Sequence, residues 1–343
     1  MVKEILSFKP KQLAKKLLAD LTDRARDVIV KRYGLEADKI MTLEAVGQIY
    51  NITRERVRQI EEFTLNTIKK SDVFAAQSSV FAELKTAMET YGGIVHEREF
   101  LAHLSADQAT QNNIHFLLVL GDAFAHLKED DTFHHRWTVD SQLADAVHSS
   151  LKNLCTRLSE NDLLSEQEMV DQFLASLHQA IHPEQARLVA RQWLNISKEI
   201  GQSPTGEWGL VKSPNVKVRG IRDYAYLVLR QEGKPMHFSA VAKAITSRFG
   251  RKANAATTHN ELIKDKRFIL VGRGIYALQD WGYRPGVTRE IIRQVLKDKG
   301  PLTKDEVVSQ VAKERLVKTN TILVNLKNPR YFKQDKSGRF VAL

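Results

Sequence analysis

One pattern of segments recurs along the sequence at intervals of about 60–75 residues, and it limits the possible folds more than any other feature. Each interval holds two or three segments with the apolar spacing of amphipathic helices, followed by a short pair of β-forming runs. The last run of each pair carries an aromatic residue, at Trp137, Trp208, Tyr276 and Phe340. Solenoid repeats are shorter, at roughly 20–50 residues. The pattern therefore predicts a series of small domains, each with its own core.

The third interval shows the pattern most clearly. Residues 221–232, 239–249 and 253–265 predict three helices. The run 268–278 then predicts a β-hairpin, because two apolar stretches flank the glycine-containing turn at 272–274. That turn is expected to close a hairpin rather than to bind a phosphate. Three helices followed by a hairpin form a winged helix, and the fourth interval repeats the same order.

The first 72 residues lack a pair of β-forming runs and predict helices throughout. Thr22, Thr42 and Thr53 each precede a segment with helical spacing, and each can cap the helix that follows. Asn51–Ile52 is expected to be a tight turn between the last two helices. On the last helix, the residues expected to face inward are Val57, Ile60, Phe63, Leu65 and Ile68.

We therefore predict a mainly α fold, with a tandem helix-turn-helix domain plus about four small winged-helix (α+β) domains. The two middle winged helices are inferred mainly because their segments follow the same order as those of the third and fourth intervals. Linkers are expected near 71–78, 140, 212–218 and 284–287. The predicted domains are a helix-turn-helix domain at 1–72, acidic winged-helix-like domains at 73–140 and 141–212, and basic winged helices at 213–284 and 285–343.

Charge changes sign along the chain in blocks of domain size. Residues 1–72 carry a net charge of +4, residues 73–211 a net charge of −10, and residues 212–343 a net charge of +17, which gives +11 for the chain. A polyanion would be attracted to both ends and repelled by the middle. Duplex DNA is thus the expected partner of the ends, while the acidic block is expected to contact protein or to act as a spacer.

Composition argues against several other classes of protein. No run of about 18 uncharged apolar residues occurs, so we expect no membrane span, and we find no signal-peptide pattern at the N-terminus. Cys155 is the only cysteine, which leaves no internal disulfide and disfavours a zinc site. No nucleotide-binding glycine loop, nucleophile elbow or paired-carboxylate motif is recognisable. We expect a cytoplasmic protein of the nucleoid, not an enzyme, with no cofactor, metal ion or small-molecule substrate.

Four short stretches of the first domain carry a resemblance to a known family. They are Leu21-Thr22-Asp23-Arg24, Lys31-Arg32-Tyr33-Gly34-Leu35, residues 42–47 and residues 53–61. This part of the chain resembles region 4 of bacterial primary sigma factors, over about 50 residues. The resemblance implies that the domain reads the upstream (−35) promoter element and docks on the flap of the RNA polymerase β subunit. Nothing in the chain resembles the promoter-melting region of a full sigma factor, so we do not expect it to initiate transcription unaided.

The helix after Thr53 has the side-chain chemistry needed to read bases. Arg54, Glu55, Arg58 and Gln59 share one helical face. Arginine suits guanine, glutamine suits adenine, and glutamate can accept from the amino group of cytosine. The resemblance assigns base reading to these same four residues. The alternative is a solvated face held by i,i+4 ion pairs. The resemblance also implies that Arg24, Lys31, Arg32 and Arg56 lie near DNA phosphates, and we expect Thr53 to contact a phosphate as well.

The third interval resembles a second family. Residues 221–225, 234–238 and 267–278 resemble the HARE-HTH winged helices, which occur in the polymerase delta subunit and in chromatin and restriction proteins. Small polar residues on its third helix and basic residues on its wing suit contacts to DNA, and the fourth interval offers a similar set. The candidate contacts are Asn254, Thr257, Thr258, His259, Lys266, Arg267 and Arg273 in the third interval, and Lys318, Thr319, Asn320, Lys333, Lys336 and Arg339 in the fourth.

Three functional hypotheses remain open from the sequence. The first is a DNA-binding transcription regulator or RNA polymerase-associated factor that reads promoter-like duplex DNA. The second is a flap-binding protein that competes with a sigma factor without reading sequence. The third is a DNA-recognition subunit of a restriction or repair system, which would need a catalytic partner chain.

Overall fold

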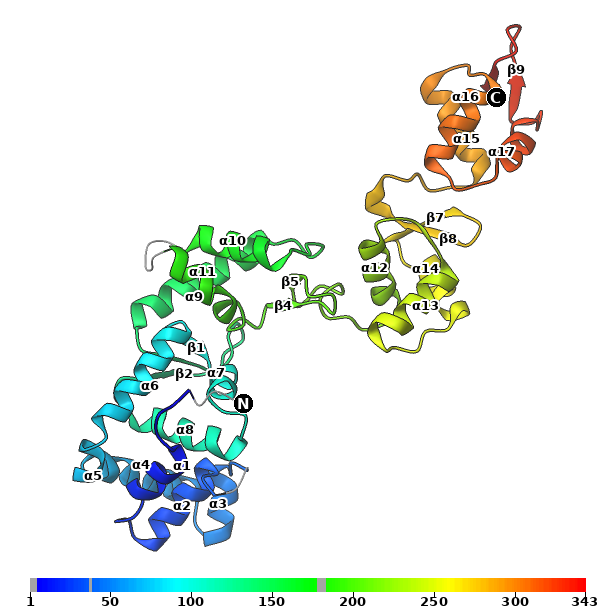
Figure 1. The fold of residues 1–343 in the computed structure, drawn as a ribbon. Helices are drawn as coiled ribbons and strands as arrows, with labels where there is room; N and C mark the ends of the chain where they lie inside the picture. The colour runs from blue at the N-terminus through cyan, green and yellow to red at the C-terminus, as the bar shows by residue number, and fades with distance from the viewer. Residues whose placement is uncertain (1–4, 37–38, 178–182) are drawn as a thin grey trace. The chain divides into compact units, whose positions relative to one another are not determined.

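The computed structural model describes residues 5–36, 39–177 and 183–343. The chain separates into two compact units, which are described separately below (Figure 1). The first unit consists of residues 1–201 and 208–211, and the second of residues 202–207 and 212–343. The regular secondary structure of the described ranges consists of helices and small antiparallel sheets, joined by loops and turns. The structure therefore confirms a mainly α fold with small α+β winged-helix domains.

The first unit begins with a region built only from helices. Two threonines set the starts of its third and fourth helices: Thr42 accepts a hydrogen bond from the Ala45 amide at 3.1 Å, and Thr53 accepts one from the Arg56 amide at 3.2 Å. Both caps follow the sequence prediction. The helices are α1 (Pro10–Leu17), α2 (Asp23–Tyr33), α3 (Leu43–Tyr50), α4 (Arg54–Lys69) and α5 (Asp72–Ala75).

A sharp turn joins α3 to α4 and forms the helix-turn-helix. Asn51 ends α3 with φ of 53°, in the left-handed region that asparagine tolerates better than most residues. Gly47 lies on α3 so close to the turn that a Cβ atom there would be 2.6 Å from the carbonyl oxygen of Ile52. The sequence thus provides the turn residue and the small residue that let the two helices pack closely.

The first winged helix follows, and it contains a strand that the sequence did not predict. This short strand, β1, precedes the second helix and pairs antiparallel with the last strand, so the sheet order is β1-β3-β2. The pairing sets Val95 opposite Trp137, the aromatic residue that ends the repeat. The elements are α6 (Ser78–Tyr91), β1 (Ile94–His96), α7 (Glu97–Leu104), α8 (Gln108–Leu120), β2 (Ala125–Leu127) and β3 (Arg136–Thr138).

The other three winged helices share this topology. In the third, β6 pairs with β8 as β1 pairs with β3. In the second and fourth, single bridges replace that pairing, from Leu164 to Trp208 and from Leu302 to Phe340. The second consists of α9 (Ser141–Arg157), α10 (Glu166–Ser176), α11 (Pro183–Leu194), β4 (Ile200–Gln202) and β5 (Trp208–Leu210). The third consists of α12 (Ile221–Glu232), β6 (Met236–His237), α13 (Phe238–Phe249), α14 (Ala255–Lys264), β7 (Phe268–Gly272) and β8 (Ile275–Leu278). The fourth consists of α15 (Thr288–Lys299), α16 (Lys304–Glu314), α17 (Thr319–Leu326), β9 (Phe332–Gln334) and β10 (Phe340–Ala342).

Two segments expected to be linkers are packed instead. Residues 72–75 form α5, and Phe74 packs against Phe81 with ring centroids 4.9 Å apart. One apolar core runs across this segment, from Leu17 and Ile29 in the helical region to Phe116 in the first winged helix. Residues 212–218 also differ from the expectation, since Ser213, Asn215 and Val216 in that stretch are buried.

Candidate nucleic-acid interface

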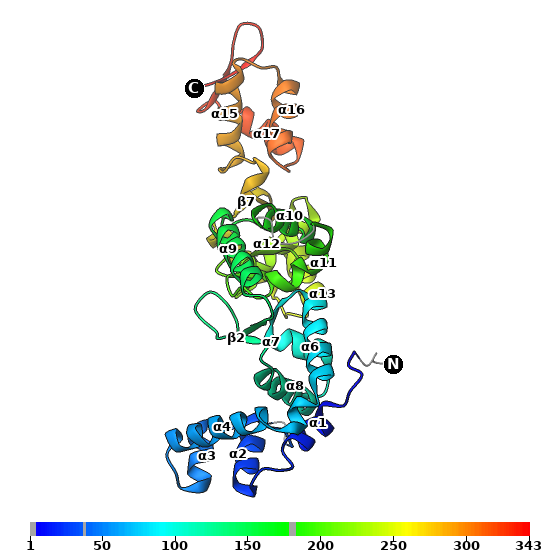
Figure 2. The same ribbon diagram turned by 90° about the vertical axis from the view of Figure 1, so that its left-hand side faces the viewer.

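Helix α4 divides into a packed face and an exposed face. Val57 is fully buried and packs with Val28 of α2 and Val46 of α3. The residues on the other face, Arg54, Glu55, Arg58 and Gln59, are all exposed. Figure 2 shows α2, α3 and α4 grouped together in the first unit. The four candidate base-reading side chains are therefore exposed to solvent, while the opposite face of α4 packs against α2 and α3.

The arginine at the centre of the exposed face is held by two carboxylates. Arg58 Nη2 lies 2.8 Å from Glu55 Oε1, and its Nη1 lies 3.0 Å from Glu62 Oε2. Hydrogen bonding to Arg58 lowers the pKa of Glu55, and the same pair raises the pKa of Arg58. Exposed pairs of this kind contribute little to stability. Arg58 can therefore exchange these carboxylates for a base edge at small cost.

The candidate phosphate contacts fall into two groups. Arg24, Thr53 and Arg56 are exposed, and the Arg24 guanidinium lies 5.6 Å from the ring centroid of Tyr50. Lys31 and Arg32 are half-buried: Lys31 pairs with an aspartate one turn earlier, and Arg32 Nε donates to a Glu61 carboxylate oxygen at 3.1 Å. Arg32 also donates to a main-chain carbonyl before α3. Arg32 therefore links α2 to α4 and to the segment before α3, and most of its guanidinium is already hydrogen-bonded within the protein.

Phe63 contradicts the predicted inward face of α4. Its side chain is 73% exposed, while the next residue, Thr64, is buried and donates to the Ile60 carbonyl oxygen at 2.6 Å. The helical period explains the difference, because Phe63 follows Gln59 by four residues and so lies on the exposed side. A cavity of about 610 Å³ lies beside it, lined in part by Arg24 and Ile60.

On α14 of the third winged helix, one candidate contact is wrong. Thr258 is fully buried and donates to the Asn254 carbonyl oxygen at 2.9 Å, because it shares the inward face with Leu262 one turn later. Asn254 is exposed and caps the helix by accepting from the Ala256 amide. Thr257 is exposed, and His259 is half-buried with its ring stacked on Phe238 at 4.3 Å.

Arg267, another candidate contact, is half-buried and bonded to groups of its own winged helix. Its guanidinium lies 2.8 Å from Asp223, 2.7 Å from Asp265 and 2.9 Å from the amide oxygen of Asn215. Burial alone would lower the pKa of Arg267, but the hydrogen bonds that it donates to the two carboxylates, together with their charges, raise it. Asp223 is itself only 2% exposed, so this network fixes the segment before α12 to the hairpin. The sequence could not show these long-range partners.

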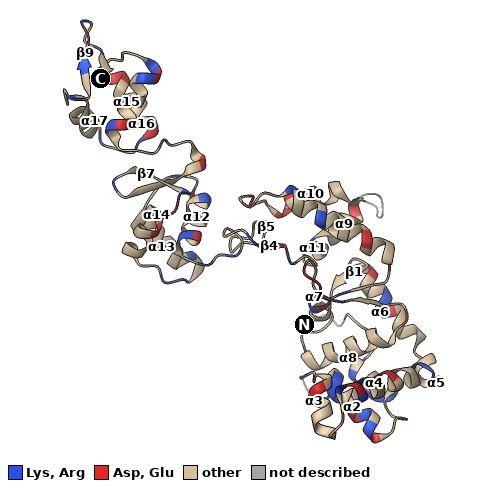
Figure 3. Cartoon of the chain, turned by 180° about the vertical axis from the view of Figure 1, so that it is seen from behind, with Lys and Arg blue, Asp and Glu red and all other residues tan. Residues whose placement is uncertain are grey.

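The remaining basic candidates are exposed. In the third winged helix these are Lys266 and Arg273. In the fourth, residues 318–320 lie at the start of α17, whose first turn has no side-chain cap. The basic residues of the β9–β10 hairpin also point to solvent, and Figure 3 shows basic colouring on this hairpin. They are Lys333, Lys336 and Arg339.

The third helices of the two acidic winged helices are covered by neighbouring elements. Asn112 and Asn113 of α8 are buried and donate from their side-chain amides to the carbonyl oxygens of Gly34 (3.0 Å) and Leu35 (3.1 Å). Helix α11 docks on the first winged helix, where Trp193 Nε1 donates to a main-chain carbonyl at 2.9 Å. By contrast, α14 and α17 each bury only two side chains. The sequence signal for α8 was an Asn-Asn pair inside an apolar helix, a placement that helices disfavour unless the amides find partners.

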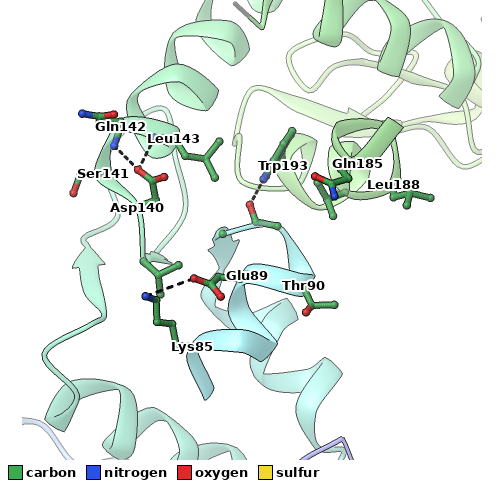
Figure 4. A pocket seen from close by; sticks show the side chains of 14 residues that line it. Lys85, Glu89, Thr90, Asp140, Ser141, Gln142, Leu143, Gln185, Leu188 and Trp193 are labelled. Atoms are coloured by element: carbon green, nitrogen blue, oxygen red, sulfur yellow. Dashed lines mark hydrogen bonds and ion pairs between the residues drawn. The ribbon is translucent and has the colours of Figure 1, made fainter. Parts of the chain in front are cut away.

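A cavity of about 1060 Å³ lies where the first and second winged helices meet (Figure 4). Its wall includes the Trp193 contact to Gly92, the Lys85–Glu89 pair at 3.7 Å and the start of α9, where Asp140 caps the helix. Lys85 and Glu89 thus bind each other, while Trp193 and Asp140 bind main-chain groups. Within the described ranges, no group of three or more His, Cys, Asp and Glu side chains is placed to hold a metal ion. No helix in those ranges is both long enough and apolar enough to cross a membrane.

Comparison with known proteins identifies two segments of the chain. Residues 17–70 match the family model for sigma-70, region 4. Residues 221–281 match the HARE-HTH family model, whose description includes the restriction endonuclease HTH domain.

Curated relatives match the first of these segments. The RNA polymerase sigma factor SigA of Nostoc sp. is 50% identical over 54 residues, which are 16% of this chain and 14% of that protein. SigA of Microcystis aeruginosa is 49% identical over 53 residues, 16% of this chain and 13% of that protein. The chain thus spans only about one seventh of the length of these relatives. Both matched families are DNA-binding helix-turn-helix domains, which supports a DNA-binding role. The chain therefore carries a sigma-70 region 4 domain at residues 17–70 and a HARE-HTH domain at residues 221–281.

Proposed function

We propose that this protein is a DNA-binding transcription regulator or RNA polymerase-associated factor of the bacterial nucleoid. It reads promoter-like duplex DNA through α4 and holds the duplex with its basic winged helices. The observation that carries the proposal is the exposed face of α4, where Arg54, Arg58 and Gln59 stand free of the core while Val57 anchors the helix behind them. A helix of this kind fits the major groove.

The proposal gives the base-reading residues distinct roles. Arg54 and Arg58 read guanines, Gln59 reads adenine, and Glu55 accepts from the amino group of cytosine. Arg24, Thr53 and Arg56 contact phosphates beside them, since all three are exposed at the same end of the domain as the start of α4. Lys31 and Arg32 contribute less, because other groups of the chain already hold them.

We propose association with RNA polymerase because the curated relatives are named RNA polymerase sigma factors. The proposed contact on the polymerase is the flap of the β subunit. This partner is tested by purifying the tagged full-length protein from cells and probing for polymerase subunits. Recovery of the polymerase supports the proposal, and its absence from a purification that retains DNA-binding activity contradicts it.

DNA reading is tested by competition between duplexes. The full-length protein is bound to a selected duplex, and unlabelled duplexes of selected and scrambled sequence compete at fixed salt. Wild type should prefer the selected sequence by roughly 10³-fold or more. Each side chain removed from α4 should cost about 1–3 kcal/mol of discrimination. The matched control is Asn66→Ala, which changes an exposed α4 residue well beyond the first two turns.

A second candidate function rests on the HARE-HTH domain, whose family name includes restriction endonucleases. In that case the chain would recognise DNA for a separate catalytic subunit. Co-purification of a nuclease, instead of RNA polymerase, would favour this function. A flap-binding protein without sequence reading is the third outcome, recognised by polymerase recovery together with equal binding to selected and scrambled duplexes.

A further inference from the structure

The third and fourth winged helices are joined by a backbone contact in addition to the chain segment between them. The amide of Leu316, in the loop between α16 and α17, donates to the carbonyl oxygen of Val271 on β7 at 2.8 Å. Leu316 also forms a parallel bridge with Gly272. A Cβ atom on Gly272 would lie 2.5 Å from the Leu316 carbonyl oxygen, so only glycine lets the loop approach this closely.

A buried arginine strengthens the same contact. Arg315 is only 4% exposed, and its guanidinium donates to two carbonyl oxygens, those of Leu270 on β7 and Gly286 before α15. The side chain thus bonds to main chain of both winged helices. Removing the side chain would therefore remove both of these hydrogen bonds.

The contact brings two candidate DNA-binding elements together. Arg273, at the wing of the third winged helix, follows Gly272 directly, and Lys318, at the start of α17, is two residues beyond Leu316. Consecutive Cα atoms are 3.8 Å apart and bridged strands about 5 Å apart, so the Cα atoms of Arg273 and Lys318 lie within about 17 Å of each other. A duplex of that length carries about ten phosphate charges.

The charges beside the contact are available to a ligand. Arg273 and Lys318 are exposed, and neither forms an ion pair with any residue that the structure describes. Thr319 and Asn320 next to Lys318 are exposed as well. One buried arginine, Arg315, bonds to both domains, while the cations at the edge of the contact remain exposed to solvent and can bind phosphates.

We propose that the wing of the third winged helix and the start of α17 form one continuous surface that binds a single DNA duplex. The contact between Leu316 and β7 holds the two elements at a fixed spacing. The inference rests on the proposed DNA-binding function and adds that the two domains engage the same duplex together.

The test uses the full-length protein and a random-sequence duplex of about 15 base pairs, titrated at several salt concentrations. Arg273→Ala and Lys318→Ala should each reduce the slope of log K against log salt by about one, and the double variant should reduce it by about two. Both side chains are exposed, so neither change should unfold the protein. If either single variant leaves the slope unchanged, the shared surface is wrong.

Gly272→Ala then tests the contact itself, since the added methyl group must displace the Leu316 loop. The matched control is Gly220→Ala, where a Cβ atom meets nothing within 4 Å. Gly272→Ala should lower affinity for the short duplex several-fold and remove the effect of Lys318→Ala, while the control binds as wild type. Unchanged affinity and an unchanged Lys318→Ala effect in the Gly272→Ala protein would overturn the fixed spacing. Lack of any duplex binding by wild type would instead overturn the proposed function.

Discussion

The side-chain amide of Asn112 donates to the carbonyl oxygen of Gly34 at 3.0 Å, and this bond attaches the first winged helix to the sigma-70 region 4 domain. Gly34 ends α2 in the left-handed conformation, and Asn112 is in the middle of α8 with 2% of its surface exposed. Asn113 makes the equivalent bond to Leu35. The helix that most winged helices would offer to DNA is here part of the packing around a second domain.

Replacing these asparagines should destabilise the first unit. Asn112→Ala or Asn113→Ala leaves a buried carbonyl group without its donor, at a cost of about 1–3 kcal/mol each. Urea unfolding, followed by circular dichroism, measures this loss. Asn153→Ala is the matched control, since Asn153 lies on helix α9 with its side chain exposed. Equal stability of all three variants would mean that α8 is not fastened in this way.

Two arginines of the HARE-HTH domain should respond differently to substitution. Arg267→Ala removes the partner of buried Asp223 and should cost about 3–5 kcal/mol of stability. Arg273→Ala removes an exposed side chain and should weaken DNA binding without changing the thermal midpoint. Scanning calorimetry and a binding titration on both variants separate the two effects. A stable Arg267→Ala protein with impaired DNA binding would reverse our assignment.

Acid should destabilise the first unit partly through His148. Its Nε2 accepts from Arg136 Nε at 2.8 Å, and burial together with the Arg136 charge lowers the pKa of His148 to about 4 from an ordinary value of 6.5. Between these two values the folded protein therefore binds fewer protons than the unfolded chain. The contribution of His148 to the free energy of unfolding is fully present above pH 6.5 and is lost as the pH falls toward 4.

His148→Gln provides the test of this pH dependence. Glutamine keeps an acceptor for Arg136 but does not titrate, so the free energy of unfolding should change less with pH in the variant. Urea titrations at several pH values between about 4 and 7 give the two slopes. Parallel slopes for variant and wild type would show that other groups cause the acid sensitivity.

DNA affinity should reside in the ends of the chain and not in its acidic block. Residues 212–343 carry a net charge of +17, whereas 73–211 carry −10. A gel shift at moderate salt should show duplex binding by the basic fragment with a steep salt dependence. Because α8 packs on the first domain, the acidic block is tested within a fragment of residues 1–211. The substitutions Arg58→Ala and Gln59→Ala in this fragment weaken the DNA contacts of the first domain itself. Tight binding by that double variant would contradict the charge argument.

Local sequence signals predicted local structure well. The threonine caps before α3 and α4, the turn at Asn51 and the hairpin at 268–278 depend on neighbouring residues, and the structure confirms each of them. The repeat of helices and strand pairs likewise predicted the winged helices. Each of these features is set by chain propensities within a few residues.

Features that depend on distant partners could not be predicted. No local pattern indicated that Arg267 meets Asp223, and the Asn-Asn pair of α8 did not show that its partners lie at the end of α2. Thr258 and Phe63 were misassigned for a smaller reason, a helical phase error that moves a side chain between the buried and exposed faces. At the candidate site, the sequence identified the basic residues. Only the structure shows which of them are buried in contacts within the protein, such as Arg315, and which are exposed to a ligand, such as Arg273 and Lys318.

The central claim, that α4 reads bases, is tested most directly by selecting duplexes from a random pool with wild-type protein and with the Arg58→Ala, Gln59→Ala double variant. Sequencing the bound DNA should reveal a motif in the wild-type pool that disappears with the double variant, while overall duplex affinity persists through the basic winged helices. The same motif in both pools would contradict the account.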